Sequence, residues 1–567
     1  MPSASAITIA ETLALLDGDH TGLANGVSQG QYMLWLGSGI SRDRIIGLDG
    51  VLTKLLDFMR GHVTAVPGCR YRAAFDEVIG FADLSDAERL TIDLTQPVDS
   101  WGCRKNLLNR LINKYSSVLN VRVAGEAPDH LLWDGLDFVH SFAAQPPSTE
   151  HLAIAMLVLE GAVSELASAN WDGLLEAAMA ELGHPPDYYR STVTGEDLRG
   201  PAQAARLYKF HGCALRAIAD EAGYRTLLIA RSRQILDWQG NERFQIVRNQ
   251  LVALLQVKHI LMVGLSAQDA NIQNLFVQAR QGGPWAANDP SPPVMFSGST
   301  ISEDQKNILH AVYGNDAYEG DEDAIDERSF VPVYGKQLLV ALLLDVYARK
   351  LQTLADDAVA AKLQQADRAA IRTGIVALRD QAAIGAEADR TRAAHIIAAI
   401  ASRARRQLSD GESPDGALPY YPLDTQPAHQ MQGKQALAAT GLREAATALG
   451  LIGLEQQAKS WALGVQDPAA RRSAAVTITS PMGSARVYFA ATDATISGLV
   501  HEDALREDDK DAIVICSRTP RERPQRNPSM QKRDGTIGFR TVDMEALLAS
   551  SEDIATLRDA FRNGCSL

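Results

Sequence analysis

Apolar and polar positions follow two periods along the chain, and these periods predict the order of its helices and strands. Residues 8–30 have a polar, helical pattern, residues 32–36 form an apolar run typical of a buried strand, and residues 51–59 again have helical spacing. Short apolar runs recur further along, at residues 163–167, 206–210 and 259–263. Strands that alternate with helices predict an α/β fold with a parallel sheet covered by helices. Such sheets bind ligands at the carboxyl ends of their strands.

The pattern also predicts an insertion and a first domain boundary. From about residue 60 to 147 the spacing is mostly helical, with a helix start at residues 85–88, which indicates a helical insertion in the α/β domain. The acidic stretch 319–323 is typical of a solvated loop. We expect the helix at 335–354 to close a domain of residues 1–355.

Residues 356–567 have a different character and are predicted to form a helix-rich α/β C-terminal region. Residues 356–408 and about 436–465 have helical spacing, and a loop rich in proline and glycine at 410–422 separates them. Strand-like runs and a closing helix follow, at residues 474–479, 486–490, 512–516, 536–540 and 543–548. None of these segments carries a catalytic motif, so we expect this region to serve assembly or partner binding.

Length and charge narrow the function classes. A chain of 567 residues exceeds what one core usually supports, which agrees with two or three domains. The formal net charge of −14 argues against direct nucleic-acid binding by the whole chain. The basic run 518–533 contains prolines but no aromatic residue for base stacking, so a solvated or protein-contacting loop is favoured there. The most apolar segments are too short to cross a bilayer, and we expect a cytoplasmic protein without membrane contact.

The cysteines and histidines show no metal-ligand spacing. The five cysteines lie far apart, and the chain has no Cys-x-x-Cys pair: they are Cys69, Cys103, Cys213, Cys516 and Cys565. In a cytoplasmic setting free thiols are expected. No two histidines have the spacing of a metal site, so no metal ion is predicted.

The most informative segment is a glycine turn after the first predicted strand. It comprises Gly37, Ser38, Gly39, Ile40 and Ser41. Glycines at such a turn let backbone N–H groups approach a pyrophosphate, and the serine hydroxyls offer further donors. The alternative is a tight strand-to-helix turn that needs small residues for packing alone.

Polar residues follow the next predicted strands as well. Asn170 and Asp172 come after the second strand, where side chains two residues apart point to the same side. A simple Asn/Asp turn is the alternative for this pair. His211 and Gly212 follow the third strand, and a neutral imidazole there suits a general base, although a lone histidine is more often structural. The other histidines, among them His62, His151, His184, His259 and His310, lack such a context.

A fourth polar segment follows residues 259–263. Gly264 and Ser266 close that strand, and Asp269 stands at the start of the next helix. Asp269 is either a ligand contact or a helix N-cap, with close to equal weight.

The order and spacing of these segments resemble the sirtuin-like family over roughly residues 30–350. The resemblance implies a Rossmann-like sheet that binds NAD, with contacts from Gly37–Ser41, Gly264 and Asp269 and with Ser266 against the adenosine ribose. It implies that Asn170 holds the nicotinamide ribose or the attacking water, that Asp172 orients Asn170 or the ribose, and that His211 accepts a proton. Residues 42–48 lack the Ile-Pro-x-Phe-Arg run of protein sirtuins.

Sirtuin deacylases also hold zinc through two close cysteine pairs, which this sequence lacks. The chain therefore resembles the sirtuin-like NADase effectors of bacterial antiphage defence, which deplete NAD during infection. This resemblance implies NAD as substrate, no zinc, a homo-oligomer, and a HerA-type ATPase or an Argonaute-like protein as partner. The expected activity is NAD+ glycohydrolysis. The alternatives are an NAD-dependent protein deacylase, a non-catalytic subunit that binds NAD or ADP-ribose, and an interaction scaffold.

Overall fold

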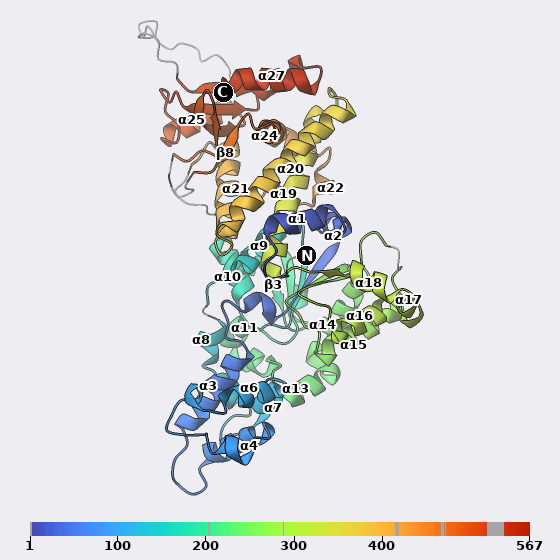
Figure 1. Cartoon of the computed structure of the whole chain (residues 1–567), viewed down its shortest axis with the longest axis vertical. Helices are drawn as coiled ribbons and strands as arrows, with labels where there is room; N and C mark the ends of the chain where they lie inside the picture. Colours follow the sequence, from blue (N-terminus) through green and yellow to red (C-terminus); the bar gives the residue numbers. More distant parts are fainter. Residues whose placement is uncertain are drawn as a thin grey trace.

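The structure is a computed structural model that describes most of the chain. The described residues are 3–143, 145–201, 204–286, 289–413, 419–466, 470, 472–518 and 538–567. Figure 1 shows the helical insertion at one end of an elongated molecule, the larger sheet in the middle and the C-terminal region at the other end. No helix among the described residues is long and apolar enough to cross a bilayer.

The middle of the molecule is a seven-stranded sheet in which every neighbouring pair is parallel. The strand order is β3-β4-β2-β1-β5-β6-β7. The strands are β1 (Tyr32–Leu36), β2 (Glu165–Ser168), β3 (Tyr189–Thr192), β4 (Ala205–Lys209), β5 (His259–Val263), β6 (Val294–Ser297) and β7 (Phe330–Val331). This sheet confirms the predicted Rossmann-like α/β fold. The apolar runs had marked β1, β2, β4 and β5, whereas β3, β6 and β7 were not predicted.

Strand β1 lies at the centre of the sheet and is buried on both faces. Tyr32, Leu34 and Leu36 belong to the core on one side, and Met33 and Trp35 belong to the core on the other. This alternation follows from the two-residue period of a strand. A continuous apolar run is therefore the expected signature of such a central parallel strand.

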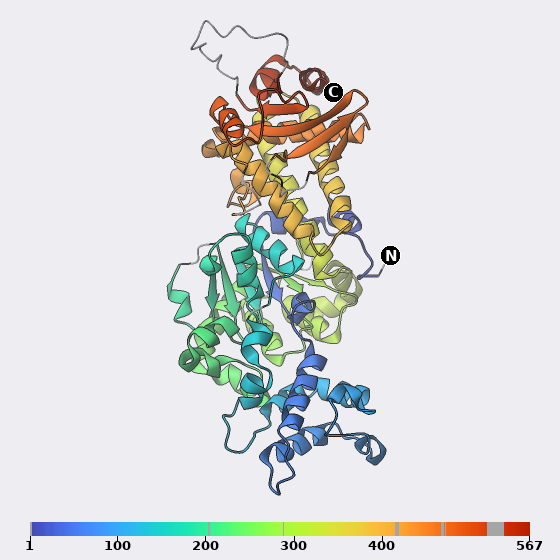
Figure 2. The same cartoon turned by 90° about the vertical axis from the view of Figure 1, so that its left-hand side faces the viewer.

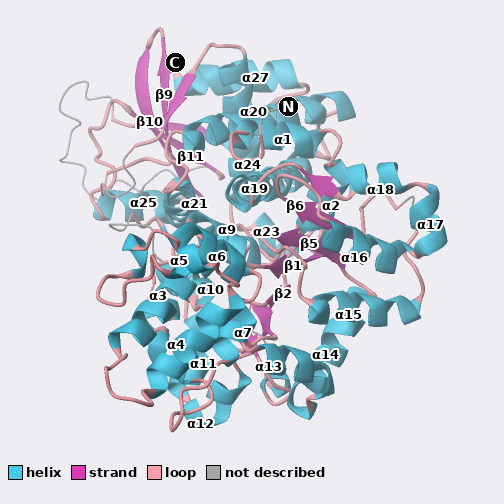
Figure 3. Cartoon of the chain, turned by 60° about the horizontal axis from the view of Figure 1, so that its bottom comes forward, coloured by secondary structure: helices cyan, strands magenta, loops and turns pink. Residues whose placement is uncertain are grey.

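Helices cover both faces of this sheet (Figure 3). One face packs against α1 (Ile9–Asp17), α2 (Thr21–Ser28), α9 (Thr149–Leu159), α10 (Leu174–Glu181) and α19 (Gly335–Val359). The other packs against α14 (Glu242–Leu255), α15 (Ala270–Ala279), α16 (Glu303–Tyr313), α17 (Asn315–Gly320) and α18 (Glu322–Arg328). Between β4 and α14 lie α11 (Ala214–Ala219), α12 (Glu221–Tyr224) and α13 (Ser232–Asp237).

Residues 319–323 are exposed, as predicted for a solvated segment, but they do not form a loop: residues 319–320 end α17, residues 322–323 begin α18, and only Asp321 lies between the two helices. Helix α18 buries Ile325, which lies among acidic residues in the sequence. Lys306 pairs with Glu322 at 2.8 Å and with Asp326 at 2.9 Å. A cation on the neighbouring helix thus offsets part of the acidic charge.

Residues 48–142 form a helical unit with its own core, drawn at the bottom of Figure 2. Its helices are α3 (Leu48–Gly61), α4 (Arg70–Phe81), α5 (Asp86–Arg89), α6 (Arg104–Ile112), α7 (Tyr115–Asn120) and α8 (Phe138–Phe142). Ser85 and Glu88 form a reciprocal capping box at the start of α5, as the predicted helix start suggests. None of the described residues between 60 and 147 lies in a strand.

The C-terminal region combines helices with a second sheet. Helix α19 continues past residue 355 without a break, and it is followed by α20 (Gln365–Glu387), α21 (Ala393–Asp410), α22 (Ala428–Met431), α23 (Gln435–Ala438) and α24 (Leu442–Gln457). The second sheet has the order β12-β11-β10-β9-β8. Its elements are β8 (Ala462–Gly464), β9 (Val476–Ser480), β10 (Gly483–Ala490), α25 (Asp493–His501), β11 (Ala512–Cys516), β12 (Arg540–Asp543), α26 (Met544–Ser550) and α27 (Ile554–Cys565). Most of the predicted basic loop, from residue 519 on, lies outside the described residues.

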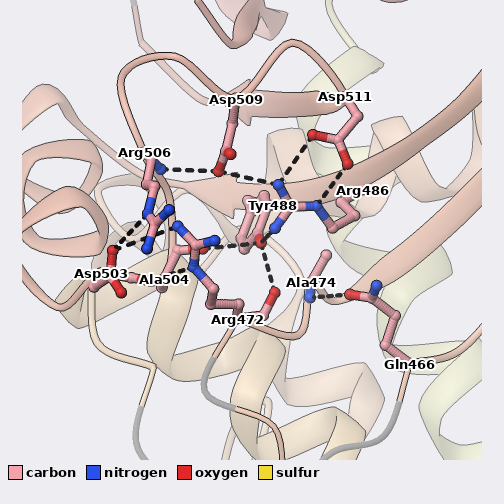
Figure 4. A network of polar contacts seen from close by, with 10 residues as sticks. All are labelled: Gln466, Arg472, Ala474, Arg486, Tyr488, Asp503, Ala504, Arg506, Asp509 and Asp511. Carbon is pink, nitrogen blue, oxygen red and sulfur yellow. Dashed lines mark hydrogen bonds and ion pairs between the residues drawn. The ribbon is translucent and has the colours of Figure 1, made fainter.

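A polar network ties β10 to the turn before β11 (Figure 4). Arg486 pairs with Asp509 at 3.0 Å and with Asp511 at 3.1 Å, and its guanidinium lies over the Tyr488 ring. The Tyr488 hydroxyl oxygen lies 2.8 Å from the Arg472 carbonyl oxygen and 3.0 Å from the Ala504 carbonyl oxygen, and its one proton is shared between these two acceptors. These contacts fix the turn, and we assign them a structural role.

Helices α20 and α24 cross at glycines, and this contact leads to a stability prediction. A Cβ atom on Gly374 would lie 1.9 Å from the Gly450 carbonyl oxygen, so Gly374→Ala is expected to destabilise the fold by about 1–3 kcal/mol. Gly385 lies in the same helix with open space around it, and Gly385→Ala is expected to stabilise by up to about 1 kcal/mol. Urea unfolding of both variants checks this, and equal effects would contradict the tight crossing.

Candidate functional site

The predicted site residues meet at the carboxyl edge of the parallel sheet. The glycine turn Ser38–Ser41 follows β1, Asn170 and Asp172 follow β2, and His211 follows β4. Gly264, Ser266 and Asp269 follow β5. Because all four strands are parallel and adjacent, their ends lie side by side.

The glycine turn packs directly against the loop after β5. The Gly39 N–H donates to the Gly264 carbonyl oxygen at 2.9 Å. A Cβ atom on Gly37 would lie 2.3 Å from that same oxygen, and Gly264 has a φ of +66° with Ile40 N only 2.7 Å from its missing Cβ. This close approach explains the need for glycine at these positions. Phosphate binding by the turn stays a prediction. Ser38 is exposed, while the Ile40 side chain lies in the core.

Asn170 is held by the glycine turn. Its Nδ2 atom donates to the Gly37 carbonyl oxygen at 3.1 Å and lies 3.4 Å from Ser41 Oγ. Its backbone N–H donates to Ser168 Oγ at 3.0 Å. Among the described residues the Asn170 Oδ1 atom has no hydrogen-bond donor, so it is the group that a ligand can use.

Asp172 is buried and belongs to the same network. Its Oδ2 atom accepts a hydrogen bond from Ser41 Oγ at 3.0 Å, and its Oδ1 atom accepts one from the Leu174 N–H at 3.2 Å. Burial raises the pKa of this carboxyl group, and the nearby Lys209 ammonium opposes that rise. Asp172 therefore orients Ser41, which in turn contacts Asn170.

His151 belongs to this network, although the sequence analysis assigned it no role. The Ser148 N–H donates to Nδ1 at 3.2 Å, which places the ring proton on Nε2, 3.3 Å from Ser41 Oγ. Burial, followed by the charges of Arg44 and Lys209, lowers the pKa of His151 to about 3, so the ring is neutral. The resulting chain of hydrogen bonds runs from His151 through Ser41 to Asp172.

A buried ion pair beneath Asp172 was also missed. Lys209 Nζ lies 2.9 Å from Glu176 Oε1 and donates to the Asp172 carbonyl oxygen. Both side chains are nearly fully buried. Nearby anionic groups raise the pKa of Lys209 against the effect of burial. The sequence did contain a signal for this ion pair: Lys209 is a charged residue within the apolar run 206–210, two residues before His211.

His211 lies in an aromatic environment at the end of β4. Its ring is 4.8 Å from the Phe210 ring and 6.2 Å from the Trp238 ring, measured between centroids. Burial lowers the pKa of His211, and the Asp269 carboxylate opposes this effect. His211 Nε2 lies 3.2 Å from Asp269 Oδ2, outside the direction of a hydrogen bond. The lowered pKa favours the neutral imidazole, and Nε2 has no hydrogen-bond partner among the described residues.

The loop after β5 carries the remaining predicted residues. Asp269 caps α15, because its side chain accepts a hydrogen bond from the Asn271 N–H at 2.8 Å. Ser266 is exposed, and next to it Ala267 has a φ of +61°. A non-glycine residue in this conformation is uncommon and carries backbone strain.

A cavity lies beside these residues and is not lined by them. Its volume is about 510 Å³, and it lies between residues 127–132 of the helical unit and residues 221–234. Arg225 and Arg231 are part of its lining. The neighbouring Ile229 N–H donates to the His211 carbonyl oxygen at 2.9 Å. We place the candidate site at the sheet edge, because the polar side chains converge there.

The described residues contain no group of three or more histidine, cysteine or acidic side chains placed to hold a metal ion. The five cysteines are separate free thiols. The prediction that the protein needs no zinc remains a prediction.

The parallel sheet with polar loops at its carboxyl edge defines a Rossmann-like α/β domain. Residues 164–313 match the family model of the SIR2-like domain, so the chain carries a SIR2-like domain. This range includes Asn170, Asp172, His211 and the loop after β5. SIR2-like domains use NAD, and the match therefore supports an NAD-dependent function. No curated protein matches the chain.

Proposed function

We propose that the protein is an NAD+ glycohydrolase that cleaves NAD+ to nicotinamide and ADP-ribose. The observation that carries this proposal is the position of Asn170 and His211 at one sheet edge within the SIR2-like domain. Asn170 offers an oriented carbonyl oxygen, and His211 offers a neutral imidazole. These two groups are what the hydrolysis of an N-glycosidic bond to a cationic leaving group requires.

The chemistry follows from the substrate. Nicotinamide leaves NAD+ from a positively charged pyridinium ring, so the electron pair of the C–N bond neutralises the ring and no general acid is needed. The ribose carbon develops oxocarbenium character, which a carbonyl dipole such as Asn170 Oδ1 stabilises. Water attacks this carbon, and its proton passes to His211. The products are nicotinamide and ADP-ribose.

We further propose a biological role as an NAD-depleting effector in bacterial antiphage defence. The support is the resemblance to sirtuin-like NADases together with the absence of any Cys-x-x-Cys pair from the full sequence. We propose that residues 356–567 serve oligomer assembly or contact a HerA-type ATPase or an Argonaute-like protein. A cytoplasmic location fits this role, because NAD is there.

The test is nicotinamide release from NAD+ by the purified full chain, with ADP-ribose quantified in the same samples. We expect equal amounts of both products. The Asn170→Ala protein, purified in the same way, is expected to lose this turnover and controls for contaminating activity. Turnover only in the presence of an acyl-lysine peptide would indicate a deacylase. NAD binding without turnover, even with a co-expressed partner, would favour a non-catalytic NAD-binding subunit.

A further inference from the structure

The two carboxylate oxygens of Asp269 have different partners. Oδ1 accepts a hydrogen bond from the Asn271 N–H at 2.8 Å and so caps α15. Oδ2 lies 3.2 Å from His211 Nε2. Because the cap fixes one oxygen, the other is held beside the imidazole by the fold itself.

The buried surroundings of the His211 ring increase the influence of the Asp269 carboxylate on its charge state. The ring is buried among the Phe210 and Trp238 side chains, where a positive charge is poorly solvated. Asp269 is the charged group that opposes the effect of burial on His211. The Asp269 charge also acts on Tyr115 of α7, whose pKa is raised by its own burial and then by Asp269.

The contact is one of charge rather than of a directed hydrogen bond. His211 Nε2 is among the buried polar atoms that have no hydrogen-bond partner in the described chain. The carboxylate therefore does not occupy the direction in which Nε2 accepts a proton. It lies beside that direction, at a distance where an opposite charge stabilises a cation.

We propose that Asp269 is a positioning residue that acts through His211, by stabilising the imidazolium formed when His211 accepts a proton. The resemblance to sirtuin-like proteins instead implies a direct contact between Asp269 and NAD. The part of this proposal that concerns turnover rests on the proposed NAD+ hydrolysis. The part that concerns the charge state of His211 does not.

The test uses substitutions that keep the helix cap. Asparagine and serine cap helices about as well as aspartate does, so Asp269→Asn and Asp269→Ser remove the charge while the start of α15 is retained. Asp553 caps α27 by accepting a hydrogen bond from the Thr556 N–H, far from the site, and Asp553→Asn is the matched control.

The first readout is the titration of the His211 ring. It is measured by NMR of the full chain with isotope-labelled histidines, and the His211 signal is assigned by comparison with a His211→Gln protein. We expect the His211 titration to move to lower pH in both Asp269 variants and to stay unchanged in Asp553→Asn. The titration does not depend on turnover, so it tests Asp269 even if NAD+ is not hydrolysed. Identical His211 titrations in the wild type and both variants would overturn the proposal.

The second readout is the dependence of kcat and KM on pH. Loss of the carboxylate is expected to lower kcat about 10- to 100-fold, part of the 10²–10⁴-fold that a general base contributes. The acid limb of kcat/KM should move to lower pH along with the His211 titration. A higher KM for NAD with an unmoved acid limb would show that Asp269 binds NAD directly and would reject the positioning role.

Discussion

A His211→Ala protein is expected to hydrolyse NAD+ 10²–10⁴-fold more slowly than the wild type, the usual contribution of a general base. In the proposed mechanism the His211 imidazole accepts the proton of the attacking water, and alanine offers no acceptor at that position. The affinity for NAD should change little, because the glycine turn and the loop after β5 remain. Initial rates of nicotinamide release and a separate measurement of NAD binding check both parts.

The control is a histidine that lies away from the sheet edge. His140 is exposed in the helical unit and pairs with Asp137, so His140→Ala is expected to turn over NAD+ at the wild-type rate. His211→Gln keeps a polar side chain of similar size and should be as inactive as His211→Ala. Normal turnover in either His211 variant would remove the proposed base and leave water activation to another group.

The sequence predicted the central part of the fold because burial leaves a clear signal there. Strands β1 and β5 match their predicted bounds, since a strand covered on both faces is a continuous apolar run. Strand β3 contains Arg190, Ser191 and Thr192 and lies at the sheet edge, and β7 has only two residues. Neither of these strands has a hydrophobic pattern long enough to detect.

The candidate site was predicted only where its residues stand next to a strand end. Asn170, Asp172 and His211 directly follow or closely follow apolar runs, so the topology alone brings them together. His151 lies in α9, a helix that is buried all round, and its contact with Ser41 spans 110 residues of sequence. Such a contact depends on how the helix packs, which periodicity does not specify.

A buried cluster joins residues 420–424 of the C-terminal region to an ion pair within residues 1–355. Lys350 of α19 donates to Glu160 Oε2 at 2.7 Å and to the Asp424 carbonyl oxygen. The Tyr420 hydroxyl and the Leu423 N–H donate to Glu160 Oε1 at 2.6 and 3.1 Å. The cluster thus joins the end of α9 to residues 420–424. Its ion pair is fully buried, with side-chain exposures of 0% for both residues.

Lys350→Met is therefore expected to destabilise the protein by about 3–5 kcal/mol, because it leaves the Glu160 carboxylate buried without a counter-charge. The double variant Glu160→Gln, Lys350→Met removes both charges and keeps the acceptor for Tyr420 and Leu423, so it should recover most of the loss. Arg372 and Asp356 form an ion pair with half-exposed Arg372, and Arg372→Met should cost about 0–1 kcal/mol. Urea unfolding of the three variants measures these differences. If Lys350→Met unfolds at the wild-type urea concentration, the buried ion pair contributes little to stability, and the two parts are held by their other contacts, such as those of Arg379 with Asp17 and of Thr149 with the Arg390 and Thr391 carbonyl oxygens.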